Sequence, residues 1–338
     1  MVLGFLFSPA LLDLIRIDKA IRGDAVTYLM IYTAGLPFLF FYNIANGIFS
    51  ALGDSRTPFL FLAASSTSNI FLDIFCVTVL EMGVDGLAWA TFSCQGVSAI
   101  LAVAVVLRRI AALPCKEKPR HFSLPILKKI LIVAVPSTLQ QSFVSVGNIF
   151  IQSAVNSFGL AVTGGYSAAI KINNFAITSI GTLGTAMSNY TAQNMGAGRM
   201  DRVKEGHRSG ILLGIGVGLI FTAVCLLFRS PLIGLFMNGD DPKAKEVGML
   251  FLLIVSPFYA MISTKLISDG VLRGAAAMGS FMTATFTDLI IRVALSFLFS
   301  AQWGSIGIWL SWPVGWACGT LLSTVFYCKG TWKKQLRI

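Results

Sequence analysis

The pentapeptide Gly83-Val84-Asp85-Gly86-Leu87 recurs near the end of the chain as Gly304-Ser305-Ile306-Gly307-Ile308. Three further matches keep nearly the same spacing: Ser8-Pro9 with Ser230-Pro231, Gly47-Ile48 with Gly270-Val271, and Asn69 with Asp288. Internal repeats of this kind are common in transporter folds. The sequence therefore predicts two related halves.

The first half is the shorter one. Apolar sequence beginning near Leu124 belongs to the second copy, and no counterpart to it precedes Met1. We therefore expect an N-terminally truncated protein whose first helices are missing.

The composition of the chain predicts a membrane protein whose surroundings are a lipid bilayer. Hydrophobic residues make up 55% of the chain, charged residues 12%, and the mean hydropathy is +0.77, whereas soluble domains carry roughly 25% charged residues. The start shows no cleavable signal peptide. Beyond a stub at 1–15, apolar runs long enough to span a membrane lie near 26–52, 57–80, 86–107, 124–155, 163–195, 209–236, 247–272, 279–300 and 305–328.

The formal net charge of +11 is unevenly distributed. Lys and Arg gather in 108–129, in 199–208 and in the tail after Lys329, and helix counting places these segments on one side. The positive-inside rule makes that side cytoplasmic. We expect a multi-pass protein of the inner (plasma) membrane with a cytoplasmic C-terminus, and no nucleic-acid partner.

Metal, disulfide and enzyme chemistry have no support in the sequence. The six cysteines follow no ligand spacing, and both histidines, His121 and His207, lie in basic segments. No serine stands in a Gly-x-Ser-x-Gly context. We expect no cofactor and no enzymatic activity.

The repeat also predicts the domain organisation. Both copies run in the same direction through an even number of helices, which relates the halves by an axis along the membrane normal, as in transporters that rock between two states. We expect a partial N-lobe at 1–110, a cytoplasmic linker at 111–123, a C-lobe at 124–330 and a basic tail at 331–338. A transporter is favoured over a channel, which more often forms from symmetric subunits.

Ionisable residues within the spans are the candidates for function, because each is costly at bilayer depth. Asn69 and Asp73 are four residues apart and share one helix face. Their oxygens suit Na⁺, and a carboxylate in an apolar cleft is also a seat for a proton. The structural alternative is a carboxylate held by neighbouring hydroxyl groups. We therefore predict a cation-coupling site at Asp73, with no metal beyond Na⁺.

The second half carries four more charges at helical spacing. Asp288 and Arg292 occupy the positions of Asn69 and Asp73 and predict an ion pair within one helix, as do Lys265 and Asp269. These four residues, together with Lys171, which has no acidic residue at helical spacing, are also candidate cavity or substrate contacts.

Two other features predict helix geometry. Gly210, Gly214 and Gly218 repeat every four residues, the spacing of close helix packing in lipid. Pro37, Pro136, Pro257 and Pro313 lie inside the predicted spans, where they loosen the helical ladder and permit bending.

Several motifs along the chain resemble the multidrug and toxic compound extrusion (MATE) family. The most specific is 189–198, Asn-Tyr-Thr-Ala-Gln-Asn-Met-Gly-Ala-Gly, which looks like the end of the family's eighth helix and contains Gln193, Asn194 and Gly196. The segment 28–37, ending in Pro37, and the segment Gly53-Asp54-Ser55-Arg56-Thr57-Pro58 resemble the fourth helix and the loop after it. Residues 270–274 look like the end of the tenth.

The resemblance implies an all-α polytopic bundle of six plus six helices, of which about nine and a half are present here. In one branch of the family the N-lobe cation site uses an Asn and an Asp four apart on helix 5 and a Thr on helix 6, which Asn69, Asp73 and Thr91 match. The site's further Asp, on helix 1, is absent from this sequence. The C-lobe acidic residues of another branch are missing, since the positions near Val144 and Ile262 are apolar.

The resulting hypothesis is a secondary-active antiporter that exports organic cations or amphipathic drugs in exchange for H⁺ or Na⁺ by alternating access, acting as a monomer when full length. One alternative is a flippase for lipid-linked sugars or peptidoglycan precursors, kept open by Lys171, Lys265 and Arg292. The other is a non-functional fragment.

Overall fold

The computed structural model describes residues 5, 8, 22–114, 122–237, 239 and 241–333. The described residues form helices joined by short turns, and they contain no strand. The chain divides into two compact units, Met1–Arg120 and His121–Ile338. The division falls inside the predicted linker, whose central residues, 115–121, lie outside the described residues, as do most of the stub at 1–15 and the tail from 334 onward.

Unit 1 contains three long helices, α2 (Arg22–Ala51), α3 (Arg56–Thr78) and α4 (Gly83–Ala111). Helix α4 packs along both α2 and α3, whereas α2 and α3 make few contacts with each other. The space between α2, α3 and α4 holds the candidate cation site.

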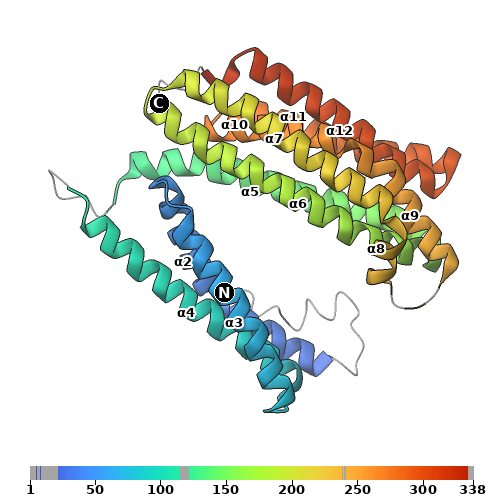
Figure 1. The fold of residues 1–338 in the computed structure, drawn as a ribbon, viewed down its shortest axis with the longest axis horizontal. Helices are drawn as coiled ribbons and strands as arrows, with labels where there is room; N and C mark the ends of the chain where they lie inside the picture. The colour runs from blue at the N-terminus through green and yellow to red at the C-terminus, as the bar shows by residue number, and fades with distance from the viewer. Residues whose placement is uncertain are drawn as a thin grey trace. The chain divides into compact units, whose positions relative to one another are not determined.

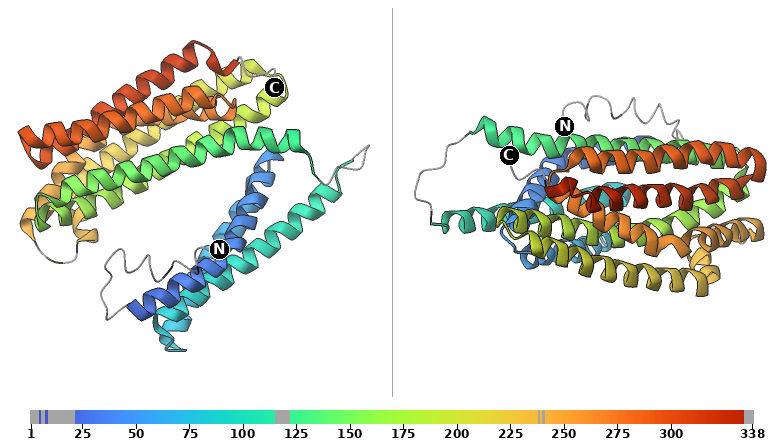
Figure 2. Two further views of the ribbon diagram at one scale, coloured as in Figure 1. Left: turned by 180° about the vertical axis from the view of Figure 1, so that it is seen from behind. Right: turned by 90° about the horizontal axis from the view of Figure 1, so that it is seen from above.

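Unit 2 is a larger bundle whose helices run side by side in the views of Figures 1 and 2. Its elements are α5 (Leu124–Asn156), α6 (Leu160–Gly196), α7 (Met200–Leu227), α8 (Arg229–Phe236), α9 (Pro242–Val255), the 3₁₀ turn η1 (Ser256–Phe258), α10 (Tyr259–Gly274), α11 (Met278–Trp303) and α12 (Ser305–Cys328). Helices α11 and α12 form the most extensive pair.

Two of the expected apolar runs contain more than one helix. The run at 209–236 is divided at Phe228 into α7 and the short α8. The run at 247–272 is interrupted by η1, which contains Pro257. Proline lacks the N–H that continues an α-helix, so this break has a local cause. Pro37, Pro136 and Pro313 lie inside uninterrupted helices.

Seven segments among the described residues are long and apolar enough to cross a membrane: Arg22–Ala51, Arg56–Thr78, Gly83–Ala111, Leu124–Asn156, Met200–Leu227, Pro242–Gly274 and Met278–Trp303. Helices α6 and α12 are not among them, although both were expected to span. Helix α6 is 37 residues long but rich in Gly, Ser, Thr and Asn, and α12 carries Trp309, Trp312 and Trp316. The fold class predicted from the sequence, an all-α membrane bundle, is confirmed.

Glycines bring the helices of unit 2 into close contact. A Cβ at Gly214 would meet the Ser263 side chain at 3.3 Å, and one at Gly218 would meet the Ala260 backbone at 2.8 Å. The four-residue glycine repeat of α7 therefore faces α10, which confirms the packing interpretation. Since apolar burial gives little drive between helices in lipid, such close backbone approach is a main source of association.

An aromatic core fills the interior of unit 2. Trp309 is fully buried, stacks on Tyr166 at a centroid distance of 5.1 Å and receives the edge of the Phe251 ring at 5.2 Å. These rings join α12 to α6 and α9. Offset and edge contacts of this type are worth about 0.5–1.5 kcal/mol each beyond area burial.

Candidate functional site

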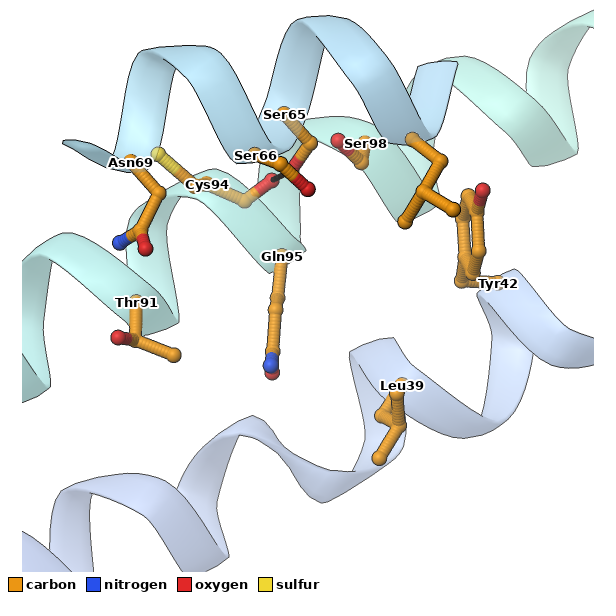
Figure 3. A pocket seen from close by; sticks show the side chains of 10 residues that line it. Leu39, Tyr42, Ser65, Ser66, Asn69, Thr91, Cys94, Gln95 and Ser98 are labelled. Carbon is orange, nitrogen blue, oxygen red and sulfur yellow. Dashed lines mark hydrogen bonds between the residues drawn. The ribbon is translucent and has the colours of Figure 1, made fainter. Parts of the chain in front are cut away.

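A polar cavity of about 190 Å³ lies inside unit 1, between α2, α3 and α4. Figure 3 shows Asn69 and Thr91 at one end of this cavity and Tyr42 at the other, with Gln95 between them. The residues that line it are Leu39, Tyr42, Leu62, Ser65, Ser66, Asn69, Thr91, Cys94, Gln95 and Ser98. Hydroxyl and amide groups thus gather in the middle of otherwise apolar helices.

The three residues predicted for a cation site come together here. The Asn69 amide donates a hydrogen bond to Asp73 Oδ1 at 3.3 Å, and both side chains are half-buried on α3. Thr91, on α4, lines the same cavity as Asn69. Asp73 is not among the lining residues and reaches the cavity through Asn69. Asp73 forms no ion pair in the described part of the chain. Its carboxylate charge is therefore available to a bound proton or cation.

Sequence reasoning missed several polar residues of this cavity. Ser65, Asn69 and Asp73 are each four residues apart, so they form one polar stripe along α3. Gln95 follows Thr91 at the same spacing on α4. The Ser65 hydroxyl donates to the Cys94 carbonyl at 3.3 Å and joins the two stripes. This four-residue spacing of hydroxyl and amide groups was the available signal.

A buried charge cluster lies in unit 2. Lys265 Nζ is 2.8 Å from Asp269 Oδ2, which confirms the predicted pair on α10. Lys265 is also 3.8 Å from Asp288 Oδ2 on α11, and the Ser323 hydroxyl of α12 donates to Asp269 Oδ1. The cluster therefore joins three helices.

The predicted ion pair between Asp288 and Arg292 is wrong. Asp288 turns to Lys265 instead, and Arg292 lies over the Trp312 ring at 4.6 Å from its centroid. The physical reason is that Lys265, on the neighbouring helix α10, attracts the Asp288 carboxylate. Gly315 of α12 packs against both residues, since a Cβ there would meet Arg292 Cβ and Asp288 Oδ1 at 2.9 Å. Asp288 Oδ1 and Arg292 Nε have no hydrogen-bond partner within the described residues.

Lys171 does not join this cluster. It is exposed on α6, and its Nζ is 5.9 Å from the centroid of the Phe236 ring on α8. No ion pair of Lys171 is found within the described ranges. A substrate contact at Lys171 stays a prediction.

The motif residues at the end of α6 form the C-terminus of that helix. The backbone N–H of Arg199 donates to the Asn194 carbonyl at 2.8 Å, and that of Ala197 donates to the Gln193 carbonyl at 3.1 Å. Gly198 has φ of +70°, the left-handed conformation that ends helices and favours glycine. Gly196 is the last residue of α6. Pro37 lies within α2.

The loop before α3 is held by a charged cluster. Asp54 accepts hydrogen bonds from the backbone of Arg56 at 3.0 Å and of Thr57 at 3.1 Å, and from the Thr57 hydroxyl at 2.6 Å. Asp54 also pairs with Arg109 of α4. The hydrogen bonds from Thr57 and the charge of Arg109 lower the pKa of Asp54 to about 2. The motif therefore ties the start of α3 to α4.

Together, a long-helix membrane fold in two units, charges buried within it and a polar cavity in unit 1 define a polytopic transporter. The chain matches the MatE family at residues 1–75 and 136–298. It is 30% identical over 337 residues to the probable multidrug resistance protein YpnP of Bacillus subtilis, covering 98% of this chain and 74% of that protein. The chain therefore belongs to the MATE family of multidrug efflux transporters.

Solved structures support the same fold. A point mutant of the Vibrio cholerae MATE transporter VcmN is 18% identical and superposes with a TM-score of 0.89, covering 97% of this chain and 74% of that one. An outward-facing multidrug resistance MATE family transporter is 23% identical, with a TM-score of 0.88 and 98% and 76% coverage. These relatives are transporters rather than enzymes, and they do not favour the flippase alternative.

Proposed function

We propose that this protein is a secondary-active antiporter that exports organic cations or amphipathic drugs in exchange for H⁺ or Na⁺. The observation that supports this proposal is the hydrogen-bonded Asn69–Asp73 pair at a polar cavity that Thr91 also lines. Carboxylate, amide and hydroxyl oxygens are the ligands that hard cations prefer. The multidrug resistance name of the Bacillus subtilis relative supports the substrate class.

The coupling step is a linkage between two ligands. A proton or Na⁺ at Asp73 removes its uncompensated charge from unit 1 and favours the conformation that releases substrate outward. Substrate bound from the inside favours loss of that cation. Because each ligand changes the affinity of the other through one conformational equilibrium, the effect is reciprocal.

The orientation belongs to the same proposal. The basic segment at 199–208, at the start of α7, and the basic C-terminal residues lie on the cytoplasmic side of the inner membrane by the positive-inside rule. The opposite end carries Asp241 and Glu246. Substrate then enters from the side of the basic loops, and the protein acts as a monomer.

The test is transport by the full chain in proteoliposomes. We expect Asp73→Asn to abolish ethidium uptake driven by a proton or sodium gradient, because an amide does not bind a proton or a cation as a carboxylate does. Asp85→Asn is the matched control, since Asp85 is an exposed carboxylate in the same unit. Transport by Asp73→Asn at the rate of the Asp85→Asn control would refute the proposal.

A further inference from the structure

A second cavity of about 190 Å³ lies within unit 2, between α5, α6, α10 and α11. Its polar walls come from Gln140 and Gln141 of α5, Thr185 of α6, Thr285 of α11, and the charged residues of α10. The cation site proposed above lies in the other unit, so this cavity is a separate site.

The carboxylate of this cavity is already neutralised. Asp269 receives Lys265 at 2.8 Å and the hydroxyl of Ser323. Asp288 is 3.8 Å from the same ammonium group. Of the charged residues that line the cavity, Lys265 and Asp269 therefore neutralise each other.

Arg273 gives the cavity an excess positive charge. Its guanidinium donates to the Thr185 hydroxyl at 3.3 Å and lies 5.9 Å from the centroid of the Phe281 ring. No carboxylate pairs with Arg273 within 4 Å in the part of the chain that the structure describes. A planar guanidinium with free donors matches the oxygen pair of a carboxylate or phosphate.

Thr285 provides an independent observation. Its side chain is 6% exposed and lines the cavity, yet its hydroxyl has no hydrogen-bond partner among the described residues. Buried polar groups are paired in the great majority of cases, because an unpaired one carries a desolvation penalty. An oxyanion beside Arg273 would accept from this hydroxyl and from the amides of Gln140 and Gln141.

The cavity also lies toward the end at which an exporter loads its substrate. A Cβ at Gly274 would meet the Thr191 side chain at 2.9 Å, and one at Gly184 would meet the Leu266 carbonyl at 2.6 Å. Helix α10 therefore runs parallel to α6, and Arg273 lies beside the end of α6 that precedes the basic segment at 199–208, most of which is the start of α7. In the proposed orientation this end is cytoplasmic.

We propose that this cavity binds the negatively charged oxygen group, carboxylate or phosphate, of a small organic compound, with Arg273 and Thr285 as its ligands. The substrates of this transporter then include organic anions and zwitterions besides organic cations. The role of this cavity in export rests on the proposed function. Binding of the anion does not depend on that proposal.

The test measures fluorescein binding, as a dianionic probe, to the full chain in nanodiscs by fluorescence anisotropy at fixed ionic strength. We expect Arg273→Gln to weaken binding by about tenfold or more, because the charge-assisted pair is lost. Arg273→Lys should retain part of the affinity, and Thr285→Val should weaken binding with less effect on the fold. Arg202→Gln, at an exposed arginine of α7, is the matched control.

Ethidium binding to the same variants separates an anion site from a merely structural arginine. Arg273→Gln should bind this cation as tightly as the wild type or more tightly. Equal loss of both probes, fluorescein affinity unchanged in Arg273→Gln and Thr285→Val, or no saturable fluorescein binding to the wild type would each overturn the inference.

The two proposals fail separately. If ethidium is not transported but fluorescein binding depends on Arg273, the antiport proposal falls and the anion site stands. If Asp73-dependent ethidium transport proceeds and fluorescein does not bind, the anion site falls alone.

Discussion

Lys265 holds two carboxylates at once in the interior of unit 2. Lys265 is 3% exposed as a residue, and Asp269 and Asp288 are 5% and 7% exposed. Removing one partner of a buried ion pair leaves a charge without compensation, and that costs more than the pair itself contributes. The Lys265 ammonium group therefore stabilises the contact between α10 and α11.

Replacing this lysine tests that dependence. We expect Lys265→Met to lower the free energy of unfolding by about 3–5 kcal/mol, because two buried carboxylates lose their shared cation. Lys171→Met is the control, since Lys171 is exposed on α6 and exposed substitutions usually change stability by less than about 0.5 kcal/mol. The measurement is denaturant unfolding in detergent. Equal midpoints for the two variants would contradict the buried-cluster interpretation.

Asp54 gives a pH-dependent prediction outside the membrane spans. Because its pKa is lowered from 3.8 to about 2 in the folded protein, the folded state binds fewer protons than the unfolded state below pH 4. The contribution of Asp54 is therefore fully present above the ordinary carboxyl pKa and is lost as the pH falls toward 2.

Hydrogen exchange at the start of α3 measures this contribution. We expect the amides of Arg56 and Thr57 to exchange faster in Asp54→Asn than in the wild type at pH 6. The difference should shrink as the pH falls through the range from 4 to 2, after correction for intrinsic exchange rates. A difference that does not change with pH would show that the carboxylate charge is irrelevant to the cap.

Spacing along the sequence predicted one buried ion pair correctly and one incorrectly, and the positions of the individual charges explain the difference. Lys265 and Asp269 are four apart and meet, as helix geometry allows. Asp288 and Arg292 have the same spacing, but Lys265 lies on a neighbouring helix and attracts Asp288. Spacing within one helix carries no information about charges on another, so the second outcome required the tertiary packing.

At the scale of helices, glycines decide which faces meet. Gly184 of α6 faces Leu266 of α10, and Gly270 of α10 faces the backbone of α6 in return. A methyl group added at Gly181, one turn earlier on α6, would meet nothing within 4 Å besides its chain neighbours and the backbone of its own helix. Close packing of α6 on α10 thus depends on one of these α6 glycines and not on the other.

A pair of alanine variants tests this difference. We expect Gly184→Ala to destabilise unit 2 by about 1–3 kcal/mol, because the added Cβ would lie 2.6 Å from the Leu266 carbonyl oxygen and the helices must separate. Gly181→Ala should be neutral or stabilising by up to about 1 kcal/mol, through helix propensity alone. Thermal unfolding in detergent measures both, and the opposite order would contradict the packing described here.

Helix existence was predictable from hydropathy, but two internal breaks were not. Arg229, Ser230 and Pro231 follow Phe228, where α7 ends and α8 begins, but the run is apolar on both sides of them. Pro257 was visible as a possible bend, yet the same residue type at Pro37, Pro136 and Pro313 leaves the helix uninterrupted. Whether a proline breaks a helix in lipid depends on how its neighbours satisfy the freed carbonyl, and hydropathy does not report this.

At the scale of the whole molecule, the proposed topology predicts which residues face the cytoplasm. We expect Lys333→Cys, in a background without native cysteines, to resist a membrane-impermeant maleimide in intact cells and to react in inverted vesicles. Lys243→Cys, at the exposed start of α9, should behave in the opposite way. The same labelling pattern for both positions would refute the orientation.

A two-part architecture could be predicted from the sequence because matched glycines and polar residues recur at a nearly constant spacing, although the two halves are otherwise dissimilar. The proposed coupling residues could be predicted only in part. Asp73 and Asn69 are conspicuous as polar groups in an apolar span, whereas Thr91 followed from family resemblance. The cavity of unit 2 was missed, since Arg273 and Thr285 lie on different helices and neither is unusual in its own segment.

Displacement of the coupling cation by substrate decides whether Asp73 links the two ligands. The measurement is release of protons, or of radioactive sodium, from the purified full chain in detergent when ethidium is added. We predict release from the wild type and from Asp85→Asn, and none from Asp73→Asn. No release from the wild type, or undiminished release from Asp73→Asn, would contradict the antiport mechanism.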